Sequence, residues 1–497
     1  MAKVQWDDVQ AIVLRGYGDL PHSAYLLWRF NTESGLAKRQ WLATLAERLM
    51  RASAGGDDEP GAAHAGRGTT RSAINLALTA TGLQQLGVGE PTLNSFSPEF
   101  LEGMAPLPSD ETRAPRRSSI LGDIGESSPQ YWDWGGWHEQ REIDGLLLLF
   151  ATDEDSLREL VESETRKMAG VAQRIPLDLK GHFNPDFKEH FGFKDGISQP
   201  LIEGAPQRKR PRHRDEKQAR ISQVKPGEFV LGYPNERNER VGDRGAMNGN
   251  APHAKRDIRL NGTYLVFRQL EQDVAAFDDF VSRLAAYLGK TKDWVAARLM
   301  GREPDGKPLI QDGTDAPEDC VRNDFLYHYE DRTGLACPIG AHVRRANPRD
   351  SLGSDPDTAL RLSKMHRIIR RGRPYGKRWD PSGRAGDGED RRGMLFIALN
   401  ADIAGQFEMI QHTWINNPHF GGLYTGTDPI SHFDDESPIT IQRRPTNLHI
   451  RRKAPFVKVR GGAYFFLPGI QALRDMAASV PDETLLTASS RLSHVAA

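Results

Sequence analysis

The stretch EHFGFKDGISQP, residues 189–200, places a carboxylate where it could transfer protons. Asp195 lies between two glycines, Gly192 and Gly196. Glycines on both sides allow a sharp bend and the close approach of a bulky group. An aspartate at such a bend is either an ordinary turn residue or an acid–base group that faces a pocket. Taken alone, the stretch leaves both interpretations open.

A histidine followed by arginines forms the second group, in ACPIGAHVRRANPRD at residues 336–350. His342 precedes Arg344, Arg345 and Arg349. A lone histidine is most often a structural or surface residue, but several guanidinium groups close by suit an anion held beside the ring. A haem offers two propionates and an iron that imidazole can ligate. The stretch therefore indicates a candidate haem site.

The third group is in HRIIRRGRPYG, residues 366–376. Ile368 and Ile369 form a short apolar piece, and Arg370 and Arg371 follow before a glycine. One interpretation is the end of a strand with solvated arginines. The other is that one arginine turns inward beside the carboxylate of Asp195.

In this order, the three stretches resemble the motifs of the dye-decolorizing peroxidases. GFKDG is similar to the GxxDG signature of that family, AHVRRANPR to its proximal-histidine segment, and IIRRGRPYG to its distal-arginine segment. The opening DVQAIVLRGYGDLPHSAYLLWRF and the closing GMLFIALNADIAGQFEMIQHTWINNP and VRGGAYFFLPGIQALR also resemble the family. GxxDG alone would be a weak signal, because glycine–aspartate turns are common. The ordered set over most of the chain is specific.

The resemblance implies an α+β fold of duplicated ferredoxin-like domains, each an antiparallel sheet with helices packed on one face. We predict an N-terminal domain, residues 1–240, that carries GFKDG, and a C-terminal domain, residues 241–497, that carries the proximal histidine and the distal arginine. One haem b per chain would lie between the sheet and the helices of the second domain. The sequence contains no CxxCH motif, which agrees with non-covalent attachment.

The resemblance also implies a role for the residues that match its motifs. His342 would be the proximal iron ligand, Asp195 the distal acid–base residue, and Arg370 the distal arginine, with Arg371 as the alternative. Arg344 or Arg345 would contact a propionate.

Three further positions would complete the haem site by the same resemblance. Met394 and Phe396 would cover the distal face of the haem, although the family more usually has leucine where this chain has Met394. Glu408, with Asp402 as a nearby alternative, would be the carboxylate behind the proximal histidine.

The function that the resemblance implies is a haem-dependent peroxidase that reduces hydrogen peroxide. It would oxidise bulky dyes, phenols or other aromatic reductants in one-electron steps. Dyes too large to fit beside the haem would donate electrons at the surface through a tyrosine or tryptophan that the sequence does not identify. We expect an acidic pH optimum, because an aspartate (pKa ~3.9) stands where other peroxidases use a histidine (~6.5).

Two other functions remain open at this point. Chlorite decomposition uses the same type of scaffold, although the GFKDG aspartate favours peroxide chemistry. A haem-binding or haem-iron handling protein without a peroxidase role would need His342 and the arginines but not the pair of Asp195 and Arg370.

The candidate site residues must be positioned by the strands and helices of the fold. The sequence contains strand-like runs, each followed by a helical pattern. Apolar or alternating runs at residues 24–30, 72–80, 144–153, 263–270 and 394–402 predict strands, and helical spacing follows each. Strands joined to helices in this way favour antiparallel sheets with helices on one face. The two halves look like divergent copies of one plan, and the polar stretch at residues 234–255 is the candidate boundary.

The amino-acid composition limits the binding partners and the cellular location that we expect. Lys and Arg number 66 and Asp and Glu 67 in the 497 residues, so no overall charge favours nucleic acid or an anionic membrane. The basic run RKRPRHR has no interleaved aromatics and predicts a solvated loop. No apolar run approaches the ~20 residues that span a bilayer. Two cysteines and an N-terminus without a secretory pattern predict a cytoplasmic protein, either a monomer or a homo-oligomer.

Overall fold

The central strands of the fold coincide with the apolar runs of the sequence. The computed structural model describes residues 3–31, 35–53, 71–107, 113–137, 142–206, 220–240, 257–310, 323–379, 391–432 and 438–478. The long strands are β1 (His22–Phe30), β2 (Ser72–Leu78), β3 (Gly145–Ala151), β8 (Thr263–Gln272), β11 (Gly393–Asn400) and β14 (Val457–Leu467). All 7 residues of β3 are buried, as its run of consecutive leucines requires.

These strands form two antiparallel half-sheets that join at one point. The order is β10-β11-β8-β14-β2-β3-β1-β4, and the two halves meet where Phe466 of β14 pairs with Leu78 of β2. The pairs β1–β3, β2–β3, β8–β11 and β8–β14 are all antiparallel. The short edge strands are β4 (Ala172–Arg174), β5 (Lys180–His182), β9 (Ile369–Arg370) and β10 (Arg373–Tyr375). Antiparallel sheets and an α+β arrangement are therefore confirmed.

One face of each half-sheet contributes to a shared core. Tyr25 of β1 and Phe267 of β8 lie with their ring centroids 5.2 Å apart. Leu148 of β3 and Ile397 of β11 belong to the same buried cluster. The other faces of the half-sheets pack against helices. The alternation of Ile74, Leu76 and Leu78 predicted that these three side chains share one buried face, and all three lie in the second large hydrophobic cluster.

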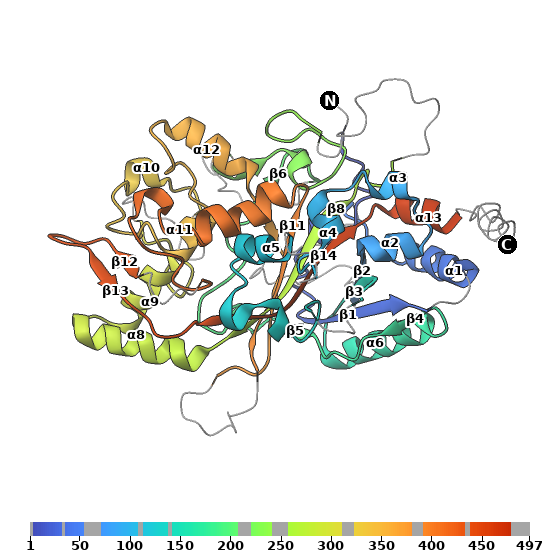
Figure 1. Ribbon diagram of the computed structural model, residues 1–497, viewed down its shortest axis with the longest axis horizontal. Helices are drawn as coiled ribbons and strands as arrows, with labels where there is room; N and C mark the ends of the chain where they lie inside the picture. The colour runs from blue at the N-terminus through green and yellow to red at the C-terminus, as the bar shows by residue number, and fades with distance from the viewer. Residues whose placement is uncertain are drawn as a thin grey trace, which may run out of the picture.

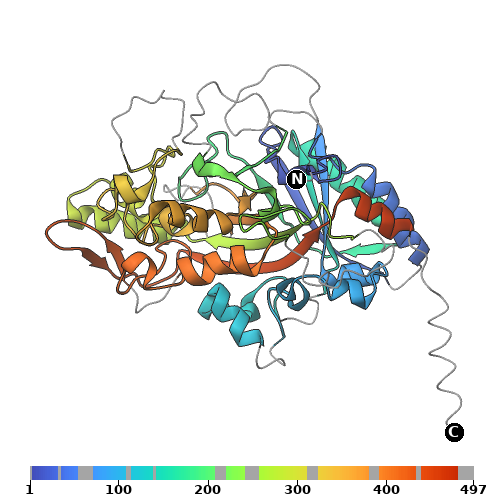
Figure 2. The same ribbon diagram turned by 90° about the horizontal axis from the view of Figure 1, so that it is seen from above.

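The helices gather at the two ends of the molecule. Figures 1 and 2 show the blue helices at one end with the red C-terminal helix, and the yellow and orange helices at the other, with the teal α5 between them in Figure 1. At the first end are α1 (Gly35–Ala46), α2 (Ala80–Gln85), α6 (Glu154–Met168) and α13 (Ile470–Ala478). Helix α13 lies against α1, so the end of the chain completes the core of the N-terminal half.

The remaining elements surround the second half-sheet. They are α8 (Val274–Leu288), α9 (Lys292–Met300), α10 (Tyr327–Glu330), α11 (His342–Ala346), α12 (Pro356–Met365), the π-helical segments η6 (Ala404–Glu408) and η7 (Ile410–Ile415), η8 (Phe420–Gly422), β12 (Ile439–Ile441) and β13 (Leu448–Ile450).

In the first half, the shorter elements are η1 (Ala11–Val13), α3 (Glu90–Leu93), α4 (Pro98–Glu102), α5 (Arg113–Leu121), η2 (Gly125–Ser127), η3 (Pro129–Tyr131), β6 (Leu201–Ile202), β7 (Gln223–Val224) and η4 (Pro226–Glu228). None of the helices in the described ranges is long and apolar enough to cross a bilayer.

The GFKDG segment packs against the second half of the chain. The rings of Phe191 and Phe277 of α8 lie 4.5 Å apart, and Phe193 belongs to the same cluster. This contact carries a motif of the first half to the elements that hold the other two motifs. The boundary between residues 240 and 241 stays a prediction, because residues 241–256 lie outside the described part of the chain, as does the basic run at 208–214.

Candidate active site

Asp195 and Arg370 form an ion pair, although 175 residues separate them in the sequence. Nη1 of Arg370 lies 2.6 Å from Oδ1 of Asp195. Arg370 is on β9, which pairs with β11 opposite Ala398. Arg371, the next residue, points the other way and donates to the carbonyl oxygens of Ile12 and Val13. The structure therefore brings Arg370, and not Arg371, to the aspartate.

The turn that carries Asp195 is held by its own neighbours. Gly192 and Gly196 have φ of 93° and 79°, a region that favours glycine, so the predicted bend is present. The carboxylate of Glu189 accepts from the backbone N–H groups of Phe191 and Phe193, each at 2.9 Å. These hydrogen bonds fix the backbone that leads to Asp195.

Gln199 connects the same segment to the arginine. Its Oε1 accepts from the backbone N–H of Arg370 and its Nε2 donates to the carbonyl of Arg370, both at 3.0 Å. This pair of hydrogen bonds fixes the position of the Gln199 side chain relative to the backbone of Arg370. In the sequence, the glutamine just after GFKDG was the only indication of this role.

The environment keeps the Asp195 carboxylate ionised. Burial alone would raise its pKa, but the charge of Arg370 and the N–H of Gly196 outweigh burial and lower the pKa below its ordinary value of 3.8. An ionised carboxylate is a proton acceptor. The fixed guanidinium beside it can stabilise a developing anion.

His342 begins the short helix α11 and is held by a carboxylate. Its Nδ1 donates to Oδ2 of Asp428 at 2.9 Å. The other oxygen of Asp428 accepts from the backbone N–H groups of Ile430 and Ser431, at 2.9 and 2.8 Å. A proton held on Nδ1 leaves Nε2 as the ring nitrogen that can ligate a metal.

The pKa values of this pair move in opposite directions. Burial alone would raise the pKa of Asp428, but the His342 ring and the N–H of Ser431 hold it well below its usual range. Burial alone would lower the pKa of His342, yet the charge of Asp428 raises it. The carboxylate therefore stabilises positive charge on the imidazole, which makes the ring a stronger electron donor to a metal.

His342 lies close enough to the Asp195–Arg370 pair for their charges to act on one another's pKa values. Their side chains are 30%, 33% and 33% exposed. Burial is nonetheless the largest single influence on the pKa values of His342 and Asp195. The charge of His342 also acts on the pKa of Asp195. Among the described residues, no hydrogen bond or ion pair joins His342 to either partner.

One face of β11 supplies apolar side chains beside this pair. Met394 and Phe396 are partly exposed, whereas Leu395 and Ile397, which alternate with them, are buried on the opposite face. Because side chains two apart share a face of a strand, Met394 and Phe396 lie on the same side as Ala398, the partner of Arg370. The predicted apolar residues thus accompany the predicted ionic pair.

Comparisons with known proteins agree with these motifs. The multifunctional dye peroxidase DyP2 of Amycolatopsis sp. is 30% identical over 423 residues, which are 81% of this chain and 82% of the relative. Peroxidase 2 of Mycetinis scorodonius is 30% identical over 436 residues, with 81% of this chain and 76% of the relative covered. The chain belongs to the dye-decolorizing peroxidase family. No family model matches the chain.

A solved structure supports the same assignment. The DyP-type peroxidase of Anabaena sp. has 25% sequence identity and a TM-score of 0.71, and the match covers 95% of this chain and 94% of that structure. The fold is accordingly the α+β fold with duplicated ferredoxin-like units that the sequence predicted. The protein is a haem-dependent peroxidase, an oxidoreductase that acts on hydrogen peroxide.

One prediction for the site of this peroxidase is wrong. Glu408 is not the carboxylate behind His342, because it forms an ion pair with Arg117 and accepts from the hydroxyl of Tyr464 at 2.8 Å. The alternative, Asp402, accepts from the N–H of Gly405. Asp428 holds the histidine from a loop 86 residues away, and no spacing rule connects the two.

The prediction for Arg344 and Arg345 is also wrong. Both guanidinium groups are buried and donate to the protein itself. Arg344 donates to Asp331 at 3.1 Å and to the carbonyl of Cys337 at 2.8 Å. Arg345 donates to the carbonyl of Trp414 at 2.6 Å. Their physical role is to brace the loops around α11, which holds His342 in place.

Proposed function

We propose that this peroxidase binds one haem b non-covalently between His342 and the Asp195–Arg370 pair. It reduces hydrogen peroxide there and oxidises bulky dyes and phenols in one-electron steps. The observation that carries the proposal is that one imidazole with a carboxylate behind it and one carboxylate–guanidinium pair lie near enough for their charges to act on one another. The names of the curated relatives, which include a multifunctional dye peroxidase, support the class of reductant.

The residues around this space fit a haem. His342 would offer Nε2 as a ligand to the iron, and Met394 and Phe396 would offer apolar contact for a porphyrin. Among the described residues, no cluster of three or more His, Cys, Asp or Glu side chains could hold a metal. An iron held mainly by a porphyrin agrees with this donor set.

Arg367 is a better candidate for a propionate contact than Arg344 or Arg345. It is buried and donates to the carbonyl of Ser198 at 3.2 Å. Burial, together with the charges of Arg349 and Arg370, lowers its pKa to about 9. Several guanidinium groups that destabilise one another in this way form a site that favours an anion.

The roles of the distal residues follow from their charges. Peroxide must lose a proton from one oxygen and gain a proton on the oxygen that leaves as water. Asp195, ionised and within reach of the space, takes the first proton and returns it to the leaving oxygen. Arg370 cannot exchange protons at working pH and instead stabilises negative charge as the O–O bond polarises. Haem, when bound, supplies the iron that binds peroxide and stores its oxidising equivalents.

An absorption spectrum with and without peroxide tests the proposal. We expect purified protein to show a Soret band that shifts when one equivalent of hydrogen peroxide is added and returns when a phenol follows. A Soret band that peroxide does not change would support a haem-carrying role instead. Oxygen release from chlorite would support the chlorite-decomposing alternative. The Asp195–Arg370 ion pair favours the peroxidase over both.

The pH dependence of the peroxide reaction gives a second test. We expect the rate constant for peroxide to stay level as the pH falls from 7 to about 4, because the lowered pKa of Asp195 keeps the base ionised. The rate should fall only as the pH passes below the ordinary pKa of an aspartate. Stopped-flow absorbance at fixed ionic strength measures it.

The variant Arg370→Leu sharpens the pH test. Without the guanidinium, only the N–H of Gly196 and the charge of His342 oppose burial, so the pKa of Asp195 should rise. The acidic limb of the profile should therefore move to higher pH, whatever the effect of the change on the maximal rate. A wild-type profile that already declines below a midpoint near 6.5 would indicate a histidine base and contradict the role of Asp195.

The proposal extends to partners and location. A cytoplasmic setting is supported by the presence of only two cysteines, which cannot form a disulfide framework. The near balance of charges gives no support for nucleic-acid or membrane partners. Monomeric and homo-oligomeric states are both compatible with the proposal.

A further inference from the structure

The turn that carries Asp195 is held together by Glu189. The backbone N–H of Glu189 donates to the carbonyl of Phe193 at 3.0 Å. The N–H of Asp195 donates to the carbonyl of Phe187 at 3.3 Å, just before Glu189 in the chain. The carboxyl group of Glu189 accepts from the N–H groups of Phe191 and Phe193. The backbone and the side chain of one residue therefore both stabilise this turn.

A third donor connects Glu189 to the central sheet. Nε2 of Gln272, the last residue of β8, donates to Oε2 of Glu189 at 2.7 Å. The backbone N–H of Gln272 donates to the carbonyl of Arg392 at 2.8 Å, directly before β11. Strand β11 carries Met394 and Phe396, the two apolar side chains beside the ionic pair. Glu189 thus joins the turn to the strands next to the proposed haem site.

The proposed peroxide reaction assigns no step to Glu189. Among the described residues, no hydrogen bond or ion pair joins its carboxyl group to Asp195 or Arg370. Any effect of Glu189 on the reaction must therefore pass through the position of Asp195. Three N–H donors depend on this one carboxyl group, and a buried donor that loses its acceptor costs free energy. A side chain that could not accept from all three donors would let the turn move.

The acidity of Glu189 lets it hold the turn in both of its charge states. Burial, with the charge of Asp195 acting in the same direction, raises the pKa of Glu189 to about 7, although its three hydrogen bonds oppose the rise. Below neutral pH the carboxyl group is therefore protonated and uncharged. A protonated carboxyl group keeps acceptor capacity on both oxygens, whereas the amide of a glutamine has only donors on one side.

Two charged groups from other elements act on Asp195. They are Arg370 of β9 and His342 of α11, and both lower the pKa of the aspartate. Arg370 has the larger effect and also donates to the carboxylate. Any movement of the turn that separates Asp195 from Arg370 would therefore raise the pKa of Asp195.

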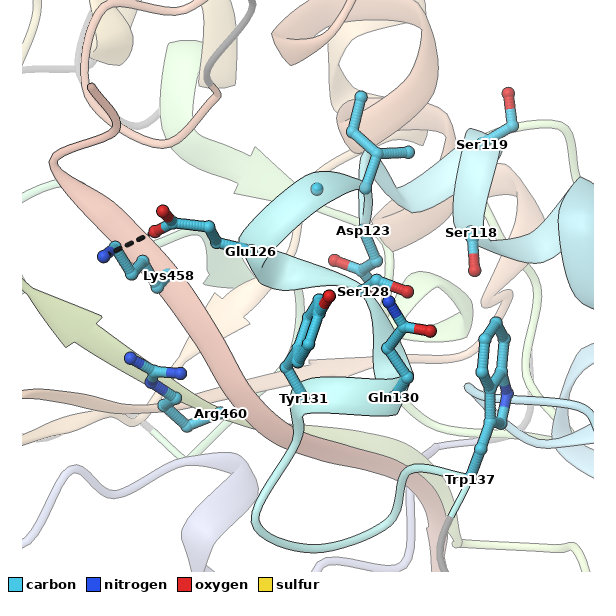
Figure 3. Close-up of a pocket in the computed structure, with 12 residues that line it drawn as sticks. Ser118, Ser119, Asp123, Glu126, Ser128, Gln130, Tyr131, Trp137, Lys458 and Arg460 are labelled. Carbon is cyan, nitrogen blue, oxygen red and sulfur yellow. Dashed lines mark ion pairs between the residues drawn. The ribbon is translucent and has the colours of Figure 1, made fainter. Parts of the chain in front are cut away.

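The remaining titratable neighbours are constant in the experiments below. Lys188, His190 and Lys194 belong to the turn segment itself. Burial lowers the pKa of His190 to about 4, but this residue is unchanged in every variant and cannot cause a difference between them. Glu271 of β8 is paired at 2.7 Å with Arg460, which lines a separate surface groove of about 960 Å³ (Figure 3).

We propose that Glu189 is a positioning residue of the peroxidase, which holds the turn against β8 so that Asp195 stays within hydrogen-bond reach of Arg370. The inference rests on the proposed function, in which Asp195 moves the proton of peroxide. Glu189 takes part in no proton transfer and acts only by fixing the turn. Loss of its acceptor oxygens therefore slows the peroxide reaction without loss of haem.

Glu189→Gln removes one acceptor and nearly keeps the shape of the side chain. At pH values where Asp195 is ionised, we expect the rate constant for hydrogen peroxide to fall about tenfold, the effect of one buried donor left without an acceptor. The acidic limb of the pH profile should move to higher pH, because a looser contact with Arg370 raises the pKa of Asp195. Glu189 is already uncharged in this acidic range, so removal of its charge cannot cause the shift.

Stopped-flow absorbance of the haem-containing enzyme measures both the rate constant and the acidic limb. Asp186→Asn is the matched control, because Asp186 lies in the same segment and pairs with Arg378 instead of holding the turn. This control should match wild type at every pH. A Glu189→Gln enzyme with the wild-type rate constant and the wild-type acidic limb would overturn the inference.

A double-mutant cycle separates positioning from general damage to the fold. In the Asp195→Asn background, Glu189→Gln should change the rate constant by less than about twofold, since no proton acceptor is left to position. An equal loss of rate in both backgrounds would show general damage and would also overturn the inference. Haem content and the position of the Soret band should match wild type in the Glu189→Gln enzyme.

Gln272→Leu tests the same role from outside the turn and is informative even if Glu189→Gln does not take up haem. It removes only the donor from β8, so we expect a rate constant a few-fold below wild type and an acidic limb displaced in the same direction. An unchanged rate and limb in Gln272→Leu would show that β8 does not hold the turn. A wild-type enzyme that does not react with peroxide would instead contradict the proposed function itself, so the two failures are distinguishable.

Discussion

Asp195→Asn is expected to slow the reaction with hydrogen peroxide by about 10²–10⁴-fold, the contribution typical of a positioned acid–base group. Asparagine keeps the shape of the side chain but cannot accept a proton from peroxide. It also leaves Arg370 without the carboxylate that lies 2.6 Å from it. Haem content should be unchanged, because Asp195 is on the side of the space opposite to His342 in the proposed arrangement.

The measurement is the initial rate of the Soret change in a stopped-flow experiment at several peroxide concentrations. Asp186→Asn is the matched control, since Asp186 lies in the same segment and pairs with Arg378 near the surface. This control should react at the wild-type rate. If Asp195→Asn also reacts at the wild-type rate with full haem content, the proton is moved by another group, and Asp195 is a structural partner of Arg370.

The distal half of the site could be predicted because its signals are local. Two glycines around an aspartate specify a bend, and a short apolar piece before two arginines specifies the end of a strand. What the sequence could not decide was which arginine turns inward. That depends on the alternation of β9, which directs Arg370 to the face of Ala398 and Arg371 to the carbonyls of Ile12 and Val13.

The proximal half was predicted less well because its partners are remote in sequence. His342 stood out through its neighbours, but Asp428 lies in a loop 86 residues later and has no spacing signal. Glu408 was predicted in its place because it lies within one of the closing motifs. The π-helical turn of η6 instead places its carboxylate beside Arg117 and Tyr464. Helical phase of this kind cannot be obtained from residue types alone.

The prediction of the propionate contacts from the positions of arginines in the sequence also failed, because residue types do not show the direction in which a helix points its side chains. Arg344 and Arg345 are the arginines closest to His342 in sequence, yet α11 directs both into the protein, where backbone carbonyls accept from them. Arg367 is farther along the chain and is brought close to Arg370 by the short strand that follows it. Strand β3, in contrast, was predictable, because it is an apolar run that must be buried on both faces.

His342→Ala is expected to weaken haem binding by about 100-fold or more, beyond the 10–100-fold typical of losing an outer partner of a metal ligand. The imidazole is the one protein group that the geometry offers to the iron. Its loss removes the axial bond and leaves Asp428 buried without the ring that its Oδ2 accepts from at 2.9 Å. Haem content per chain and the position of the Soret band measure the effect, with His412→Ala, a change to an exposed histidine, as the control.

Two further measurements separate loss of the ligand from loss of the fold. Free imidazole added to His342→Ala should enter the space left by the side chain and restore the wild-type Soret position, which an unfolded chain could not do. Asp428→Asn keeps the histidine but weakens its hydrogen bond, so we expect haem to remain bound with 10–100-fold lower affinity. If His342→Ala retains haem with an unchanged spectrum, the iron has another ligand. The space between His342 and the Asp195–Arg370 pair would then not be the haem site.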